Sequence, residues 1–147
     1  MIRMRQMGVQ HMYKHILFPT DGSEVSEKAI NDTVALAKLL NAKITAMTVL
    51  PRASQTASDS IGSDRPNKAV ELLAKIRQVT AASEITCDVL SVENDQPHEG
   101  IIAAATQKGC DLIVMGSHGR SGISALVLGS VTAKVLTHSS IPVLVYR

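Results

Sequence analysis

The chain has 147 residues, 45% of them hydrophobic, with a formal net charge of +2 and two cysteines, which suits one domain that needs no disulfide scaffold. Trp is absent, Phe occurs once and Tyr twice, so the core must be aliphatic, and the stacking aromatics of a single-strand nucleic-acid binder are missing. Arg3 and Arg5 account for the whole positive excess, so the remainder of the chain has no net charge with which to form a nucleic-acid-binding face.

The chain is expected to begin with a disordered N-terminal extension over residues 1–12, followed by one domain over residues 13–147. The extension carries charge but lacks the apolar segment of a signal peptide. No stretch of about 18 apolar residues, the length that crosses a membrane, occurs in the sequence. Cys87 and Cys110 form no CxxC pair and are interpreted as ordinary thiols of a reducing compartment. We therefore expect a cytoplasmic protein that makes no membrane contact.

The first part of the domain alternates strand and helix signals. Residues 15–20, HILFPT, form a short apolar run stopped by a proline and the following DGS, which predicts a buried strand ending in a turn. Over residues 24–40 apolar side chains recur every three or four positions, the spacing of an amphipathic helix, and Ser23 is placed to cap it. Residues 43–50 are rich in β-branched side chains and predict a second strand.

The same alternation continues through the middle of the chain. The polar, serine-rich residues 51–66 predict a long loop, and residues 67–82 return to helical spacing. Residues 85–92 predict a third strand. A third helix is predicted from Pro97, which suits a first helical turn, to Gly109, which suits a helix end. The unbroken apolar run DLIVM at residues 111–115 predicts a fourth strand buried on both faces.

A fourth helix over residues 130–139 and a fifth strand over residues 141–146 complete the pattern. Regular strand-helix alternation of this kind predicts an open, parallel, Rossmann-like sheet with helices on both faces. Ligands of such sheets bind beyond the carboxyl ends of the strands, where the strand order reverses. That rule points to the residues following the first and the fourth strand.

The stretch GSHGRSGISALVLGS, residues 116–130, joins the fourth strand to the fourth helix. Free backbone N–H groups and the positive end of the helix dipole meet there, which favours an anion. Gly116, Gly119 and Gly129 have no Cβ to obstruct a phosphate, and Ser130 adds a hydroxyl. The glycine spacing matches neither a Walker A loop nor the dinucleotide fingerprint.

Through these residues the sequence resembles the universal stress protein family. The resemblance covers about residues 13–147 through ILFPTDGS, DLIVMGSHGRSG, LGSVTAKVL and IPVLVY. The pattern G-x2-G-x9-G-S is that of the ATP-binding branch of this family. The resemblance implies a five-stranded parallel sheet of order 3-2-1-4-5 and a homodimer paired through the C-terminal strand.

The resemblance also implies an ATP site, carried over residue by residue. The adenine and ribose contacts would be Pro19, Asp21 and Val49; the ribose and phosphate contacts would be Met115, Gly116, Gly119, Gly129 and Ser130. A carboxylate at Asp21 can accept from ribose hydroxyls, and Val49 offers an apolar surface to a base. Members of this branch hold Mg²⁺ or Mn²⁺ through the phosphates, so we assign no protein metal ligand and no catalytic residue.

Each of these features also has an ordinary structural explanation. The glycines could form a flexible turn, and Asp21 could form an Asx turn or cap a helix. His118 lies inside the glycine-rich loop but has no orienting carboxylate near it in sequence, so no catalytic role is assigned to it. The other histidines show no mutual spacing typical of a metal site: His11, His15, His98 and His138.

Three functions therefore stay open. The predicted one is an ATP-binding, nucleotide-responsive regulator in the stress response. The second is a slow ATPase or autokinase, for which the sequence identifies no residue to orient the nucleophile. The third is a dimeric interaction scaffold that does not use nucleotide. The sequence identifies neither the triggering stress nor a downstream partner.

Overall fold

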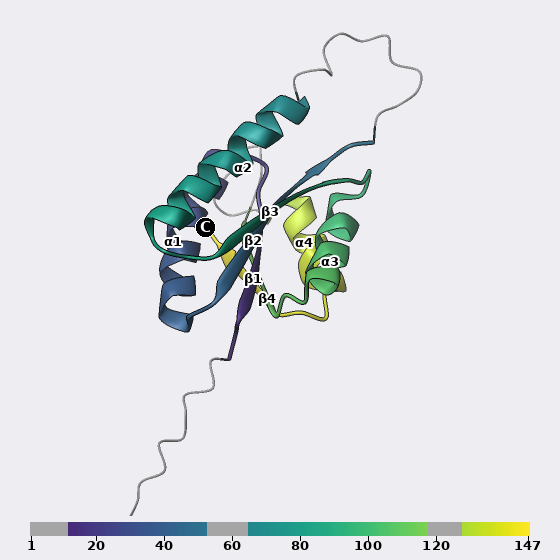
Figure 1. Cartoon of the computed structure of the whole chain (residues 1–147). Helices are drawn as coiled ribbons and strands as arrows, with labels where there is room; N and C mark the ends of the chain where they lie inside the picture. Colours follow the sequence, from purple (N-terminus) through teal and green to yellow (C-terminus); the bar gives the residue numbers. More distant parts are fainter. Residues whose placement is uncertain (1–11, 53–64, 118–127) are drawn as a thin grey trace, which may run out of the picture.

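The computed structural model of the chain describes residues 12–52, 65–117 and 128–147 (Figure 1). Strands and helices alternate along these residues: β1 (His15–Pro19), α1 (Glu24–Leu40), β2 (Lys43–Leu50), α2 (Arg65–Ala82), β3 (Cys87–Glu93), α3 (Pro97–Lys108), β4 (Leu112–Gly116), α4 (Ser130–His138) and β5 (Val143–Tyr146). The strands are parallel and lie in the order β3-β2-β1-β4-β5. The predicted fold class and strand order are confirmed.

The sheet is covered on both faces, by α1 and α2 on one and by α3 and α4 on the other (Figure 1). Successive side chains of a strand point to opposite faces, so β1 contributes to both layers. Ile16 and Phe18 pack with Ile30 of α1, whereas Leu17 packs with Val135 of α4. This double burial explains why the sequence of β1 is a continuous apolar run rather than an alternating one.

The predicted helix ends are also observed. The Ser26 N–H donates to the side-chain oxygen of Ser23 at 3.3 Å, so Ser23 caps α1 as expected. α3 begins at Pro97 and is followed by Gly109, whose φ of 69° lies in the left-handed region that glycine adopts without a steric penalty. The N–H of Gly109 donates to carbonyl oxygens of the last helical turn, which ends the helix.

The third strand begins later than predicted. The expected strand was 85–92, but β3 starts at Cys87 and ends one residue further on. Glu84 has a φ of 58°, and the Ile85 N–H donates to the carbonyl oxygen of Thr80 at 2.9 Å. Ile85 therefore completes the end of α2 and cannot pair with the sheet.

The fifth strand also begins later than the predicted 141–146. The Ile141 N–H donates to the side-chain oxygen of Ser139 at 3.0 Å, and Pro142 has no N–H, so regular pairing starts at Val143. The predicted ends of α1 and β2 are confirmed, and the remaining observed ends differ from the predicted ones by at most two residues; for example, α2 starts at Arg65, inside the predicted loop. Among the helices of the described ranges, none has the length and apolarity to cross a bilayer.

Some predictions fall on residues outside the described ranges. Residues 1–11 of the expected extension, residues 53–64 of the expected serine-rich loop and residues 118–127 of the glycine-rich loop belong to this group. The expectations for these segments stay predictions.

Candidate functional site

A cavity of about 380 Å³ lies at the carboxyl ends of β1 and β4. β1 and β4 are neighbours in the sheet, but the chain leaves β1 for α1 on one face and leaves β4 for α4 on the other (Figure 1). The two connections diverge, and the crevice between them is the place where open parallel sheets bind ligands.

The structure brings together nearly all the residues predicted for the site. Seven of the eight line this cavity: Pro19, Asp21, Val49, Met115, Gly116, Gly129 and Ser130. Gly119, the eighth, lies outside the described residues. Residues separated by more than a hundred positions in the sequence thus share one surface because β1 pairs with β4.

Seven further residues line the cavity: Thr20, Ser23, Ser26, Pro97, Ile101, Val131 and Thr132. Four of them lie within the two predicted motifs: Thr20 and Ser23 in PTDGS, and Val131 and Thr132 in LGSVT. Pro97 and Ile101 belong to α3, which follows β3 at the edge of the sheet. Nothing in the sequence signals that this helix leans over the ends of β1 and β4.

Hydrogen bonds hold the loop after β1 in one shape. The Thr20 N–H donates to the carbonyl oxygen of Met47 at 2.8 Å, which continues the pairing of β1 with β2. The Ser23 N–H donates to Oδ1 of Asp21 at 2.9 Å, an Asx turn, and the hydroxyls of Thr20 and Ser26 hydrogen-bond to each other. Asp21 therefore has the structural role that its sequence context allowed, and it also lines the cavity.

A second set of bonds anchors the start of α4 to the sheet. The Gly129 N–H donates to the carbonyl oxygen of Ser117 at 2.6 Å, and the Ser117 N–H donates to that of Tyr146 at 2.7 Å. Oγ1 of Thr132 donates to the carbonyl oxygen of Gly116 at 2.9 Å. These bonds fix the direction of the helix start relative to β4.

The first turn of α4 presents donors to the cavity. The Ala133 N–H donates to the carbonyl oxygen of Gly129 at 2.9 Å, so the N–H groups of Ser130, Val131 and Thr132 precede the first bond of the helix. No side chain in the described part of the chain caps this end of α4. All three residues line the cavity, where the positive end of the helix dipole adds to their donors.

The other wall of the cavity is apolar. Pro19, Val49, Ile101 and Met115 contribute aliphatic surface from four different elements or their ends. α3 lies close to β2: a Cβ added at Gly100 would be 3.4 Å from Cγ2 of Val49, an ordinary van der Waals distance. Apolar surface and a row of N–H donors lining the same cavity suit a ligand with a flat ring at one end and an anion at the other.

The lining is poor in groups that titrate. Among its described residues, Asp21 carries the one ionisable side chain. General acid–base catalysis needs an ionisable group within hydrogen-bond reach of the proton that it transfers. The described lining therefore offers Asp21 as its one ionisable candidate for proton transfer.

The buried titratable groups lie at the opposite end of the sheet. His15 opens β1, where burial, helped by the charge of Lys43, lowers its pKa below 6.5, and its Nε2 lies 2.7 Å from Oγ1 of Thr45. Burial raises the pKa of the nearby Cys110 thiol to about 11. Cys110 is therefore an unreactive thiol at neutral pH.

The whole domain matches known proteins. The model of the universal stress protein family matches residues 12–147. The universal stress protein YxiE of Bacillus subtilis is 31% identical and covers 92% of this chain and 100% of its own length. The solved structure of MJ0577, a universal stress protein of Methanocaldococcus jannaschii, is 31% identical and covers 91% of this chain and 95% of that one, with a TM-score of 0.81. A solved universal stress protein in complex with cAMP is 26% identical, covers 92% of this chain and 97% of that one, and has a TM-score of 0.72.

Proposed function

Because the chain belongs to the universal stress protein family, we propose that it binds ATP in the cavity between β1 and β4 and acts as a nucleotide-responsive regulator in the stress response. One observation carries this proposal. The uncapped first turn of α4 opens into the same cavity as the Asp21 carboxylate and the apolar surface of Val49. These three surfaces match the phosphates, the ribose hydroxyls and the base of a nucleotide.

In this proposal each predicted residue takes a defined part of the ligand. Gly129 and Ser130, with Gly119, receive the phosphates. Asp21 accepts from the ribose hydroxyls beside the backbone of Met115 and Gly116. The base lies on the apolar wall, against Pro19 and Val49. The universal stress protein solved with cAMP supports an adenine nucleotide as the ligand class.

Mg²⁺ or Mn²⁺ would accompany the phosphates. The side chains of the described lining carry oxygen groups and no imidazole or thiol, a setting that suits these hard ions. Within the described ranges no group of three His, Cys, Asp or Glu side chains is placed to hold an ion without the nucleotide. Phosphate oxygens and water would therefore supply most of the ligands, and the ion would neutralise charge on the bound phosphates.

The lining favours binding over turnover. Phosphoryl transfer requires a group that orients the nucleophile in line with the γ-phosphate. Asp21, the ionisable side chain of the described lining, already accepts the N–H of Ser23, and we assign it to the ribose. We therefore infer regulation by occupancy, with ATPase or autokinase activity as the alternative.

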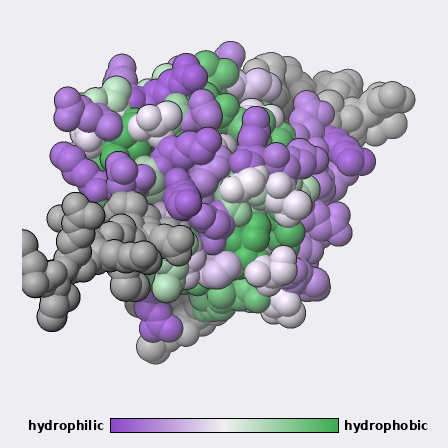
Figure 2. Space-filling view, turned by 60° about the horizontal axis from the view of Figure 1, so that its bottom comes forward, coloured by the Kyte–Doolittle hydropathy of each residue, from purple (hydrophilic) through white to green (hydrophobic). Residues whose placement is uncertain are grey.

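We further propose that two copies pair through β5. β5 and β3 are the two edges of the sheet, and an edge strand with an apolar surface invites pairing. β3 carries Asp88 and Glu93, whereas β5 has the sequence VLVY, with Leu144 39% exposed. On the face shown in Figure 2 the surface is mostly hydrophilic, with its largest hydrophobic patch below and to the right of the centre and smaller ones near the upper edge. The charges protect the β3 edge from pairing and leave β5 as the candidate.

We place this dimer in the cytoplasm, where Cys87 and Cys110, both free thiols in the structure, would stay reduced. The functional unit would be the domain over residues 13–147, with residues 1–12 as an extension of it.

The deciding experiment is analysis of the purified chain for bound nucleotide. The protein is denatured, and the supernatant is examined for adenine nucleotides by chromatography and mass spectrometry. Calorimetric titration of nucleotide-free protein with ATP and Mg²⁺ follows. We expect adenine nucleotide in the supernatant and one ATP site per chain. An empty supernatant together with no heat of binding would leave only the scaffold function.

A second measurement separates the regulator from the enzyme. Bound ATP incubated with Mg²⁺ or Mn²⁺ should remain largely intact over many binding lifetimes. Rapid release of phosphate that is lost in Ser130→Ala would instead identify an ATPase.

A further inference from the structure

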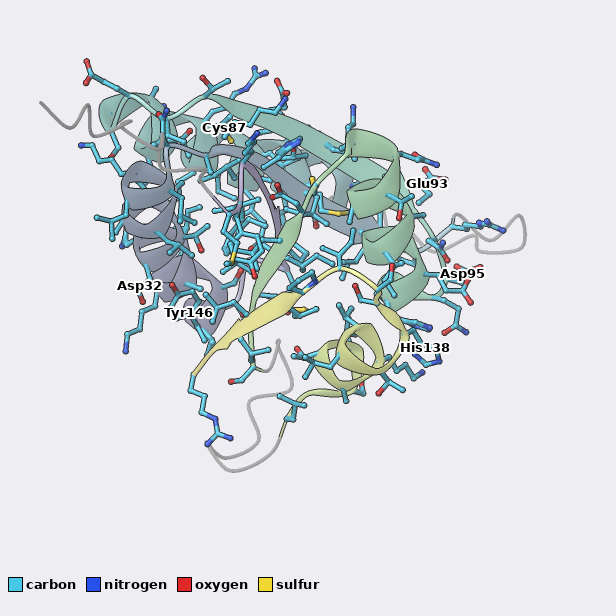
Figure 3. The ribbon with its side chains drawn as sticks, turned by 90° about the horizontal axis from the view of Figure 1, so that it is seen from below. Asp32, Cys87, Glu93, Asp95, His138 and Tyr146 are labelled. Atoms are coloured by element: carbon cyan, nitrogen blue, oxygen red, sulfur yellow. The ribbon has the colours of Figure 1, made fainter. Side chains whose placement is uncertain are left out.

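A pair of histidines joins α3 to α4 outside the cavity. His98 lies in the first turn of α3 and His138 is the last residue of α4, and their ring centroids are 5.4 Å apart. His98 is half-buried and His138 is exposed, so solvent reaches the pair. Figure 3 shows His138 at the side of α4 nearest α3. The two helices pack side by side on one face of the sheet, which brings these residues together (Figure 1).

The His138 ring is held in one tautomer. Its Nδ1 lies 2.8 Å from the carbonyl oxygen of Lys134, and a carbonyl only accepts, so Nδ1 carries the proton. The other nitrogen, Nε2, therefore has a free lone pair in the neutral ring. A backbone carbonyl that accepts from the far ring nitrogen is the usual outer partner of a metal-binding histidine, because it fixes the ring orientation and raises the basicity of the ligand nitrogen.

We propose that His98 and His138 bind one divalent ion of the zinc, nickel or copper class between α3 and α4. Two imidazoles on one tetrahedral ion, with metal–nitrogen bonds of about 2.0–2.1 Å, place their ring centroids about 5 Å apart. The observed separation is 5.4 Å, and the ring planes are tilted by 43° rather than stacked in parallel. The separation of the two rings is therefore close to that expected for two ligands of one ion.

The ligand set determines which ion binds. Among the described residues no third His, Cys, Asp or Glu joins the pair, so water completes the coordination shell. Imidazole nitrogens favour copper, nickel and zinc, whereas Mg²⁺ and Mn²⁺ prefer oxygen ligands. This site is therefore distinct in position and in ion preference from the ion proposed to accompany the nucleotide phosphates, and it does not depend on nucleotide binding.

An ion in this position would cross-link the two helices. Pro97 and Ile101 of α3 and Val131 of α4 line the cavity, so the same two helices form part of its wall. An ion that binds the folded chain and not the unfolded chain also stabilises the folded chain by mass action. A rise in the midpoint of thermal unfolding with added Zn²⁺ is thus a readout that is independent of nucleotide.

The test is calorimetric titration of the tag-free full chain with Zn²⁺ in a non-chelating buffer at about pH 7.5, because protons compete with the metal for imidazole nitrogen. We expect one ion per chain. His98→Ala and His138→Ala should each weaken the affinity for Zn²⁺ by about tenfold or more. Loss of a hydrogen-bond partner of a metal ligand already costs about tenfold, so loss of the ligand itself should cost at least as much. The double variant His11→Gln/His118→Gln removes two other histidines and should bind Zn²⁺ as the unmodified chain does.

A spectroscopic measurement identifies the ligands. The electron paramagnetic resonance spectrum of one equivalent of Cu²⁺ should show coupling to imidazole nitrogen in the unmodified chain and lose it in His138→Ala, whose exposed position leaves the fold intact. Mg²⁺ should not compete with Zn²⁺. No uptake of zinc, nickel or copper would overturn the proposal and leave an ordinary contact between two rings. Equal affinity in the unmodified chain and both single variants would overturn it as well.

Discussion

The Thr132 hydroxyl donates to the carbonyl oxygen of Gly116 across a distance of 2.9 Å. Gly116 ends β4 and Thr132 lies in the first turn of α4, so this bond joins the strand and the helix whose meeting point forms the donor side of the cavity. Thr132 is 3% exposed, and water therefore has little access to replace the bond.

Replacing the hydroxyl by a methyl group tests this connection. Thr132→Val should lower the free energy of unfolding by about 1–2 kcal/mol, because the carbonyl oxygen of Gly116 loses its donor. ATP affinity should fall as well, since the first turn of α4 is no longer fixed to β4. Chemical denaturation and calorimetric ATP titration measure the two effects.

Thr137→Val is the matched control for this prediction. The Thr137 hydroxyl donates to the carbonyl oxygen of Ala133 at 2.8 Å on the exposed face of the same helix. Loss of the Thr137 hydroxyl should change the free energy of unfolding by less than about 0.5 kcal/mol and leave ATP affinity unchanged. Equal losses of affinity in both variants would mean that the bond from Thr132 to Gly116 does not set the donor geometry.

Gly129 provides an electrostatic test of the phosphate position. Gly129 precedes α4 with φ −60° and ψ 151°, a conformation open to any residue, and aspartate is a favourable residue before a helix. Gly129→Asp should therefore keep the fold but abolish ATP binding, because a carboxylate occupies the place of the phosphates. Thermal unfolding and ATP titration of the same sample separate the two effects.

Gly129→Asn controls for size. Asparagine has nearly the same shape as aspartate, caps helices as well and carries no charge. Gly129→Asn should bind ATP more tightly than Gly129→Asp does. The difference in affinity between the two variants should become smaller at high salt, because salt screens the repulsion between the aspartate and the phosphates. Unchanged affinity in Gly129→Asp would place the phosphates elsewhere.

His15 makes the stability of the fold depend on pH. Burial, with the charge of Lys43 adding to it, lowers the pKa of His15 below 6.5, although Asp111 and Asp88 act in the opposite direction. The unfolded chain thus binds the proton more readily than the folded one. The stabilisation is fully present above pH 6.5, the ordinary pKa, and is lost as the pH falls through the lowered one.

Denaturation between about pH 7 and about pH 5 measures this effect. The free energy of unfolding should decrease across the window, and His15→Gln should flatten the decrease. Glutamine can keep a hydrogen bond to Thr45 without titrating in this range. An equally steep decrease in the variant would assign the pH dependence to other groups.

If two copies pair through β5, a charge at Leu144 should weaken the dimer. Leu144→Lys places a charge on the apolar edge strand β5 and should convert dimers to monomers in analytical ultracentrifugation at micromolar concentration. Leu39→Lys makes the same change on α1, where Leu39 is 82% exposed, and should leave the dimer intact. A chain that sediments as a monomer before any substitution would contradict the pairing.

The fold was predictable because each strand carries a local signal. Apolar runs such as residues 15–20 and 111–115 identify strands buried on both faces, and helical spacing between strands implies parallel order. The start of β3 was not predictable. It depends on the left-handed Glu84 and on the bond from Ile85 to Thr80, both of which exist only once α2 has formed.

The candidate site divides in the same way. Gly129 and Ser130 were predictable because they belong to the G-x2-G-x9-G-S pattern. Asp21 and Met115 were predictable because they lie at the ends of predicted strands. Ile101 could not be found from sequence, because its place in the wall follows from the packing of α3 across the sheet. The contact of His98 with His138 was missed for the same reason: it reflects how two helices pack and has no signature in the spacing of the residues.

The bond from the Gly129 N–H to the Ser117 carbonyl oxygen has a practical consequence for protein engineering. The 2.6 Å contact holds together the two ends of the chain segment that runs between these residues. Lengthening a segment closed at its base costs little entropy, about 0.6 kcal/mol for each doubling. A longer segment between Ser117 and Gly129 would therefore cost the fold little, but it would change the spacing of Gly119 and Gly129 on which the proposed phosphate contacts depend.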